Sequence, residues 1–331
     1  MINLAYTGLI QIAIAYTLDL VIGDPQWVYH PVRLIGRFIG GIERILRRLF
    51  LPDRLASILL TVIVVAGTYL ITYGLIESAR QWGSFCTILF GAGVIYCAIS
   101  VKSLGNEAKR VKTFLKKNDL GSARRALSYI VGRDTAHLNE EQVIRACVET
   151  VAENSVDSIL SPLFYSFLGG PCAAMAYRAV NTLDSMVGHK DEKYIRFGWA
   201  SARLDDAANY IPARISALLI PVASFLCGCD YKASLKIAFR DGRKHQSPNS
   251  GIPEAAVAGA LGIQLGGPST YQGEILEKPL IGDAQNQLTL RSIDMAIMIV
   301  HITSLLFLAF GIGSVMCLQY LLNCITGPAA I

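Results

Sequence analysis

Acidic side chains recur at every fourth position in Glu149, Glu153 and Asp157. On an α-helix this spacing turns each acid by about 40° from the one before it, so the three carboxylates form one stripe. Like charges at this spacing repel each other, so the stripe lowers the stability of the helix unless cations neutralise it. Because Mg²⁺ commonly bridges one or two carboxylates and a phosphate, we expect a metal site here; a solvated acidic face has the same pattern. Ser161 and Pro162 predict the start of a new helix, as N-cap and first residue.

A second polar cluster lies between positions 177 and 190. Its first polar side chains recur at helical spacing and share one face, and Gly188 predicts the end of that helix. Charged groups inside a membrane cost free energy and are therefore usually functional. An internal polar network is the alternative explanation for this cluster. The site candidates in this cluster are Arg178, Asn181, Asp184, His189 and Lys190.

A third cluster places two adjacent acids, Asp205 and Asp206, close to the amide of Asn209. Asp205 and Asn209 lie four residues apart and therefore share a helical face. The set suits a hard cation, and two acid-rich helices in one chain strengthen that interpretation. We therefore add Asp205 and Asp206 to the metal candidates and Arg203 to the phosphate-binding candidates.

Basic residues and a turn-forming Ser-Pro-Asn-Ser-Gly sequence are combined between positions 240 and 254. Pro253 predicts the first turn of a helix, and free N–H groups at a helix N-terminus bind anions. We expect the 247–251 turn to hold phosphate, while a basic loop beside the membrane is the alternative. The phosphate-binding candidates here are Arg243, His245, Ser247, Asn249 and Ser250.

Other chemistry is excluded or only weakly indicated. The five histidines lack a zinc-binding spacing, and the sequence contains no P-loop, nucleophile elbow or dinucleotide-binding fingerprint. Asp24 and His30, and separately the 133–135 Arg-Asp-Thr string, could each supply a phosphate or cation contact.

The elements that must carry these clusters are apolar. Of 331 residues, 53% are hydrophobic and only 17% are charged, whereas soluble globular chains carry about 25% charged residues. Residues 55–76, 81–101 and 295–331 contain no Asp, Glu, Lys or Arg, and each run reaches the length of about 20 residues that a helix needs to cross a membrane. The sequence therefore predicts an all-α, polytopic helical membrane protein with a cytoplasmic helical region and broken or re-entrant central helices.

We expect a single integral membrane domain over residues 1–331. Polar helical regions are expected at 102–157 and 230–292, the second ending in a Gly/Pro/Gln-rich loop at 266–290. The predicted spans are about 2–22, 55–76, 81–101 and 293–323.

Two central apolar segments, 158–177 and 207–229, are harder to assign. The first is interrupted by Gly169-Gly170-Pro171, and the second is short. Either both segments span the membrane, with 178–206 on the far side, or both are re-entrant, with 178–206 facing the cytoplasm. Broken helices at membrane depth usually line a protein cavity, which favours the re-entrant alternative.

The net charge is +5, from 30 Lys and Arg against 25 Asp and Glu. The excess lies mainly in loops beside the spans, which fits anionic lipid and the positive-inside rule rather than nucleic acid. The rule places the basic loop at 23–53 in the cytoplasm, and the N-terminus and the 77–80 link outside. We expect a multi-pass cell-membrane protein whose active site lies on the cytoplasmic side.

Together these strings resemble the cobalamin biosynthesis CobD/CbiB family over nearly the whole chain, about residues 4–320. The strings that carry the resemblance are 18–25, 30–32, 149–154, 161–165, 177–190, 202–206 and 247–255.

The resemblance implies an amide-forming carbon–nitrogen ligase of the adenosylcobinamide-phosphate synthase type. Such an enzyme joins (R)-1-amino-2-propanol, or its O-phosphate, to the free propionate of adenosylcobyric acid, with ATP as co-substrate and Mg²⁺ as cofactor. The implied partners are the corrinoid, aminopropanol or its phosphate, membrane lipid and the membrane cobalamin synthase of the next step; no nucleic acid is expected.

Amide formation stalls at neutral pH because a carboxylate is a poor electrophile and an amine is mostly protonated. An acyl phosphate removes the first obstacle but concentrates negative charge, which Mg²⁺ and basic residues must neutralise. We expect the five acidic metal candidates to hold Mg²⁺ or the ammonium group, and the basic candidates to neutralise phosphate. We expect His189 or an acid to take the proton of the amine. All of these groups are expected to meet at one lipid-bordered pocket. The catalytic candidates are Glu149, Glu153, Asp184, His189 and Lys190.

Two alternatives of other classes suit the same residues. Intramembrane acids could line the ion path of a transporter or channel, and paired acid-rich helices could serve a Mg²⁺-dependent transferase of a phosphorylated lipid.

Overall fold

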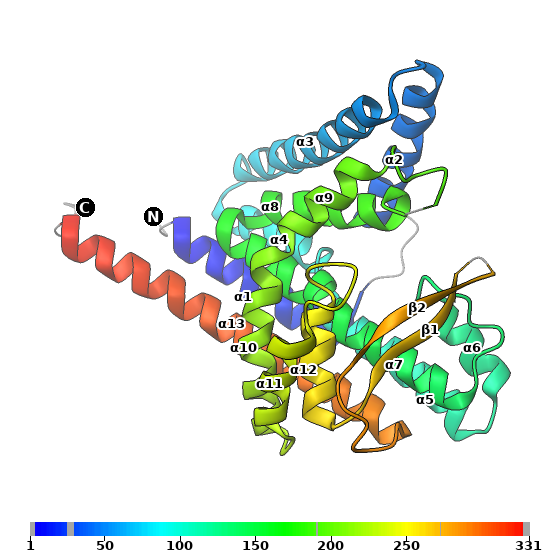
Figure 1. Ribbon diagram of the computed structural model, residues 1–331. Coiled ribbons are helices and arrows are strands. Elements are labelled where there is room, and N and C mark those ends of the chain that lie inside the picture. The colour runs from blue at the N-terminus through cyan, green and yellow to red at the C-terminus, as the bar shows by residue number, and fades with distance from the viewer. Residues whose placement is uncertain (1–3, 25–29, 190, 272, 327–331) are drawn as a thin grey trace. The chain divides into compact units, whose positions relative to one another are not determined.

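Helices form nearly all of the regular structure in the computed structural model (Figure 1). The structure describes residues 4–24, 30–189, 191–271 and 273–326. In chain order the helices are α1 (Leu4–Ile22), α2 (Pro31–Arg48), α3 (Asp53–Arg80), α4 (Ser84–Tyr96), α5 (Val101–Lys116), α6 (Leu120–Ser128), α7 (Glu140–Ser155), the π-helix η1 (Val156–Leu160), α8 (Ser161–Val187), α9 (Trp199–Ala208), α10 (Tyr210–Leu226), α11 (Tyr231–Asp241), α12 (Gly251–Leu261) and α13 (Leu290–Thr326).

The length and composition of the helices confirm the polytopic membrane class. Four stretches are long and apolar enough to cross a membrane: Asp53–Arg80, Ser84–Lys116, Glu140–Val187 and Leu290–Cys324. A fifth is added if α9 and α10, which are bent by 41°, form one span. The surface of α3 is consistent with contact with lipid, because Val62, Leu70 and Ile71 are all exposed. An apolar surface of this kind is unfavourable in water.

The connection between the second and third predicted spans lies later than expected. α3 continues through the 77–80 link, where Arg80 pairs with Glu77 at 2.8 Å. The chain turns instead at 81–83, where Gly83 has φ of +102°. Glycine adopts this conformation at little cost, and a side chain there would be strained.

The predicted break in the central apolar segment is confirmed. Gly169 and Gly170 leave the helical conformation inside α8, with φ of +63° at Gly170, and Pro171 follows.

α8 begins at Ser161, as predicted, but the N-cap role of Ser161 is wrong, because α7, η1 and α8 follow one another without a break. Ser161 has helical φ and ψ of −67° and −47°, and its hydroxyl donates to Asn209 Oδ1 at 2.6 Å. The wider π-helical turn accommodates Pro162, which has no N–H to donate to a helix.

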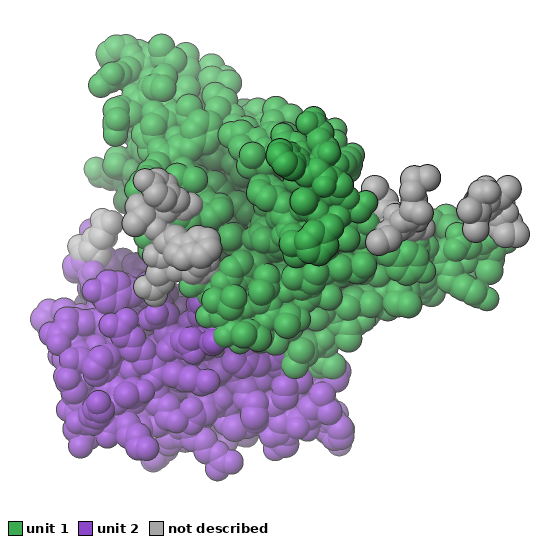
Figure 2. All heavy atoms as spheres, turned by 180° about the vertical axis from the view of Figure 1, so that it is seen from behind, with its two compact units in different colours: residues 1–99, 162–205, 305–331 green, residues 100–161, 206–304 purple. Residues whose placement is uncertain are grey.

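Contacts divide the chain into two compact units, coloured separately in Figure 2. Unit 1 comprises residues 1–99, 162–205 and 305–331, and unit 2 comprises 100–161 and 206–304. Within unit 1, α4 packs against both α1 and α3, and α2 packs against α3. Each unit is therefore assembled from segments that lie far apart in the sequence.

Unit 2 combines two helical groups and a hairpin. α5, α6 and α7 contact one another, while α12 packs against α7, α10 and α11. The close packing of α12 needs Gly259, where a Cβ would lie 2.5 Å from the carbonyl oxygen of Ala233.

An antiparallel hairpin occupies most of the segment expected to be a loop at 266–290. It consists of β1 (Leu265–Tyr271) and β2 (Glu274–Ile281), and both strands contact α12. Its Gly/Pro composition is typical of a loop, but Gly266 is required in β1 because a Cβ there would lie 2.1 Å from the carbonyl oxygen of Pro279. The hairpin depends on this cross-strand approach, which local composition does not reveal.

Candidate functional site

α7 carries the first two predicted acids into unit 2. Asn139 and Gln142 form a reciprocal capping box, with side-chain to N–H distances of 2.9 and 2.8 Å, which defines where the helix begins. Further along, Glu149 is only 2% exposed; its carboxylate accepts a hydrogen bond from Gly266 N–H at 2.7 Å and pairs with Arg133. The Glu149 side chain therefore connects α7 both to β1 and to the segment that precedes α7.

Arg133 belongs to the same group of charges, and the sequence indicated it only weakly. Its side chain is 10% exposed, and Nη1 also donates to Ser269 Oγ at 3.2 Å. Burial opposes the guanidinium charge, but the charge and hydrogen bond of Glu149 outweigh it and raise the pKa of Arg133. The Arg-Asp-Thr string before α7 was the only sequence signal for this cation.

Glu153 lies one helical turn after Glu149 and on the same side of α7. It is half-buried, and its carboxylate has no hydrogen bond or ion pair among the residues that the structure describes. Asp157 continues the spacing but belongs to η1, where the wider turn changes the helical phase. The regular stripe therefore ends at Glu153, which presents an uncommitted carboxylate.

α12 adds a third carboxyl group, Glu254, which was not among the predicted site residues. It lies in the first turn of α12 and is 3% exposed. Burial raises the pKa of Glu254 well above its ordinary value of 4.5, and the charges of Glu149 and Glu153 raise it further. Glu254 is therefore a neutral, protonated acid over a range of pH in which most glutamates are ionised. Its signal in the sequence was an acid that follows proline within the 247–255 string.

His245 brings an imidazole to the same group of charges. Burial lowers its pKa, while Glu153 and Glu149 act in the opposite direction. Its Nδ1 accepts a hydrogen bond from Ser247 N–H at 3.1 Å. In the neutral ring the proton is consequently on Nε2, which makes Nε2 a hydrogen-bond donor.

Lys278 on β2 is the second cation of the cluster. Burial and Arg133 both oppose its charge, but the hydrogen bond with Tyr271 and the charge of Glu149 raise the pKa of Lys278. Lys278 pairs with Gly267 in the strand register, so the hairpin delivers this ammonium group opposite the start of β1. The cluster of unit 2 is thus Arg133, Glu149, Glu153, His245, Glu254 and Lys278.

The predicted phosphate-binding turn is present as a closed network. Ser247 Oγ accepts from the N–H groups of Asn249 and Ser250 at 3.3 and 3.4 Å and donates to Asp206 Oδ1 at 3.4 Å. Asn249 also donates to the carbonyl oxygen of Asp206 at 2.8 Å and accepts from Arg214 at 2.7 Å. These groups already bond to one another, so the turn holds itself and Asp206 in a defined geometry.

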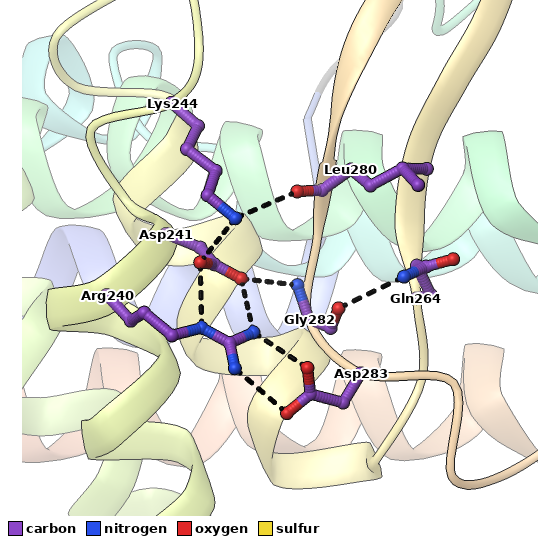
Figure 3. A network of polar contacts seen from close by, with 7 residues as sticks. All are labelled: Arg240, Asp241, Lys244, Gln264, Leu280, Gly282 and Asp283. Carbon is purple, nitrogen blue, oxygen red and sulfur yellow. Dashed lines mark hydrogen bonds and ion pairs between the residues drawn. The ribbon is translucent and has the colours of Figure 1, made fainter.

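A second polar network connects the end of the hairpin to the end of α11 (Figure 3). Asp241 has a fully buried side chain that accepts from Gly282 N–H at 2.9 Å and pairs with Arg240 and Lys244, both at 2.7 Å. Hydrogen bonds with Arg240 lower the pKa of Asp241, and Lys244 and Gly282 act in the same direction. Arg240 also binds Asp283 at 2.8 Å. The network ties the end of α11 to the end of β2. The side chain of Arg243, two residues after Asp241 in the sequence, is exposed.

The remaining predicted residues lie in unit 1. Arg178 Nη1 donates to Asn181 Oδ1 at 3.4 Å, which confirms their predicted shared face. α8 ends at Val187, immediately before the predicted stop at Gly188. A Cβ at Gly188 would lie 2.0 Å from Asp184 Oδ1, so glycine is also required by packing.

The other members of the second and third clusters differ in burial. Asp205 is 8% exposed, whereas Arg203 and His189 are exposed, and the His189 ring lies 6.3 Å from that of Tyr194. Lys190 lies outside the described residues.

The predicted metal ligands do not form a metal centre by themselves. Within the described ranges, no three His, Cys, Asp or Glu side chains are placed to hold a metal ion together. Glu149 is engaged by Arg133, and Asp205 and Asp206 belong to different units.

A cleft of about 630 Å³ opens on unit 2 along the first two turns of α7. Gln264 and residues 284–288 line its other side. No residue predicted for the site lines this cleft, but Arg145 in its wall lies one turn before Glu149.

The fold is that of a polytopic helical membrane protein, and one of its units holds a mixed-charge cluster of buried and half-buried side chains. The model of the CobD/Cbib protein family matches residues 12–300. The chain belongs to the CobD/CbiB family of cobalamin biosynthesis proteins.

Its relatives are similar over most of their length. A cobalamin biosynthesis protein CobD of Geobacter metallireducens is 49% identical over 269 residues, covering 81% of this chain and 85% of that protein. A cobalamin biosynthesis protein CbiB of Salmonella typhimurium is 47% identical over 304 residues, covering 91% and 95%. A CobD of Pelobacter propionicus is 48% identical over 283 residues, covering 86% of each chain. No solved structure matches the chain.

Proposed function

We propose that this protein is the ligase that joins (R)-1-amino-2-propanol, or its O-phosphate, to the propionate of adenosylcobyric acid, using ATP and Mg²⁺. The γ-phosphoryl group of ATP passes to the propionate, and ADP leaves. The amine nitrogen then bonds to the acyl carbon, phosphate leaves, and the amine loses a proton. The corrinoid and the amino alcohol are the proposed substrates, and the family's role in cobalamin biosynthesis supports this choice.

The observation that carries the proposal is the charge pattern of the unit 2 cluster. A ligation of this kind needs fixed cations for phosphate, a proton acceptor for the ammonium, and neutral donors for developing oxyanions. Arg133 and Lys278 are the cations, and Glu153 is the uncommitted carboxylate. His245 and Glu254 are held in neutral forms that can donate hydrogen bonds.

We assign the proton acceptor to Glu153. It is half-buried and has no partner among the described residues, so an ammonium group would find an unpaired carboxylate there. His245 is better suited to donate from Nε2, because Nδ1 is occupied by Ser247 N–H. In this proposal Glu149 positions Arg133, since its two oxygens are already bound by Arg133 and Gly266.

The residues fit Mg²⁺ as an ion that arrives with the nucleotide. Mg²⁺ keeps several waters and commonly takes only one or two carboxylates besides substrate phosphates. Glu153 offers one such carboxylate, and Asp157 is the next acid along the chain. When bound, the ion would neutralise phosphate charge, while Arg133 and Lys278 would orient the same oxygens.

The unit 1 candidates are proposed to bind the substrates. The Nε of Arg178 is buried without a hydrogen-bond partner among the described residues, and an anionic group of the substrate would satisfy it. Asn181 and Asp184 extend the same face. For Arg203, Arg243, Asp205 and His189 the predicted roles remain proposals that rest on the sequence.

A channel or transporter is less well supported. Four of the six cluster residues lie outside the helical stretches that could cross a membrane, so most of the cluster is not carried by a span: Arg133, His245, Glu254 and Lys278. We propose a multi-pass protein of the cell membrane whose site faces the cytoplasm, where ATP is available.

The direct test uses protein purified in detergent or nanodiscs with ATP, Mg²⁺, adenosylcobyric acid and each amine in turn. We expect ADP release and a product of the matching amide mass only when the corrinoid and one of the amines are both present. The mass of the product identifies the free or phosphorylated amino alcohol as substrate. Absence of amide product with either amine, under conditions where the protein is folded, would contradict the proposal.

A further inference from the structure

α2 presents two different rows of exposed side chains. Its buried row is Ile35, Ile39 and Leu46. At about 100° per residue, the exposed arginines Arg33, Arg37, Arg44 and Arg48 occupy an arc of about 60°. On the same scale the exposed Leu34 and Ile45 lie between the arginine row and the buried row. Leu34 is 45% exposed and Ile45 is 54% exposed.

The side chains of the arginine row differ from that of Arg47 in their contacts. Arg47, on the other edge of the helix, pairs with Glu43 at 2.9 Å and lies 4.2 Å from the centre of the Phe197 ring. By contrast, none of the four arginine side chains of the row has an ion pair or hydrogen bond within the part of the chain that the structure describes. The row is therefore available to an external anion.

The position of α2 in the chain places it at a membrane surface. It lies between the apolar helix α1 and the candidate span α3, and it packs against α3. Its N-terminus is held by His30, whose Nδ1 accepts from Val32 N–H at 3.3 Å and whose Nε2 contacts Asp24 at 3.0 Å. The helix is thus attached to a candidate span and follows an apolar helix, so it cannot lie far from the lipid headgroups.

The C-terminal end of α2 supports the same orientation. Phe50 has φ of +50°, a conformation that a bulky side chain rarely adopts, and it is 95% exposed. Leu49 beside it is 58% exposed. Aromatic and aliphatic side chains held outward in this way are unfavourable in water but favourable at the boundary between headgroups and acyl chains.

We propose that α2 is an interfacial helix that binds the headgroups of anionic phospholipids through Arg33, Arg37, Arg44 and Arg48, while Leu34 and Ile45 enter the acyl boundary. Guanidinium groups bind phosphate oxygens in pairs, and their alkyl stems cover apolar surface. Because no acid among the described residues pairs with these four groups, lipids with a net negative charge bind in preference to zwitterionic lipids. This inference is independent of the proposed ligation.

The test measures lipid selectivity of the full chain in detergent. Phosphatidylglycerol or phosphatidylcholine is titrated in, and bound lipid is counted by native mass spectrometry while Tm is followed by intrinsic fluorescence. For the natural chain we expect phosphatidylglycerol to bind at least tenfold more tightly and to raise Tm more. The selectivity should shrink between 50 and 500 mM salt, since exposed charges are screened. Equal binding of both lipids, or salt-independent selectivity, would overturn the proposal without any variant.

A matched pair of variants assigns the effect to α2. R33Q/R37Q/R44Q/R48Q should lose the preference for phosphatidylglycerol. The control K109Q/R110Q/K116Q/K117Q removes the same number of positive charges from exposed positions of α5 and its C-terminal turn, and it should retain the preference. Retained selectivity in the α2 variant, or equal loss in the control, would show that net charge and not this helix selects the lipid.

Discussion

The buried carboxyl group of Glu254 leads to a sharp prediction about stability. Replacing it with glutamine keeps its size and its neutral charge but removes its ability to ionise. Burial raises the folded-state pKa of Glu254 well above 4.5, so folding takes up a proton at any pH between 4.5 and the raised value. Stability is therefore complete at low pH and falls as pH rises through that window.

The size of the effect follows from linkage. One proton contributes about 1.4 kcal/mol per pH unit within the window. The natural chain should therefore lose about 1.4 kcal/mol of unfolding free energy relative to E254Q for each pH unit that lies within this window. For a chain of this length that loss corresponds to a Tm difference of roughly 2–3 °C per pH unit.

The assay is a series of thermal unfolding scans in one detergent at half-unit steps of pH. E254Q should overtake the natural chain in Tm as pH rises, whereas E274Q, which changes an exposed glutamate on β2, should follow the natural chain throughout. His245 titrates in the opposite sense, because its pKa is lowered, but it is present in all three proteins and affects each curve. Parallel curves for the natural chain and E254Q would refute the argument that Glu254 is protonated.

Three other outcomes follow from the same contacts. E153Q should lower turnover at least 100-fold with Tm within about 1 °C, because this carboxylate has no partner in the described structure; near-normal turnover would remove Glu153 as proton acceptor. R133Q should cost about 3–5 kcal/mol, seen as a lower denaturation midpoint, because it leaves Glu149 buried and unpaired, and adding E149Q should recover part of the loss. D241N should cost about 2 kcal/mol at pH 7 through its lost charged hydrogen bonds. Because the pKa of Asp241 is lowered, that difference should disappear as pH falls below 3.8, and a constant difference would contradict it.

The sequence alone determined the features that depend on local pattern. Charge-free runs predicted the spanning helices, because a helix must be apolar over its membrane-crossing length. The Gly169-Gly170-Pro171 break and the helix end before Gly188 followed from the conformational limits of glycine and proline. The shared face of Arg178 and Asn181 followed from helical periodicity.

Tertiary structure decided which charges are neutralised and by what. Glu149 accepts from Gly266, 117 positions later in the chain, and no local pattern specifies a partner at that distance. The neutral state of Glu254 depends on burial among other carboxylates, which are contributed by a different helix. Residues 265–281 form a hairpin because Gly266 in β1 lets the backbone of β2 approach closely, although the composition of the segment suggests a loop. Sequence spacing locates a helical face, whereas protonation and pairing depend on which other faces fold against it.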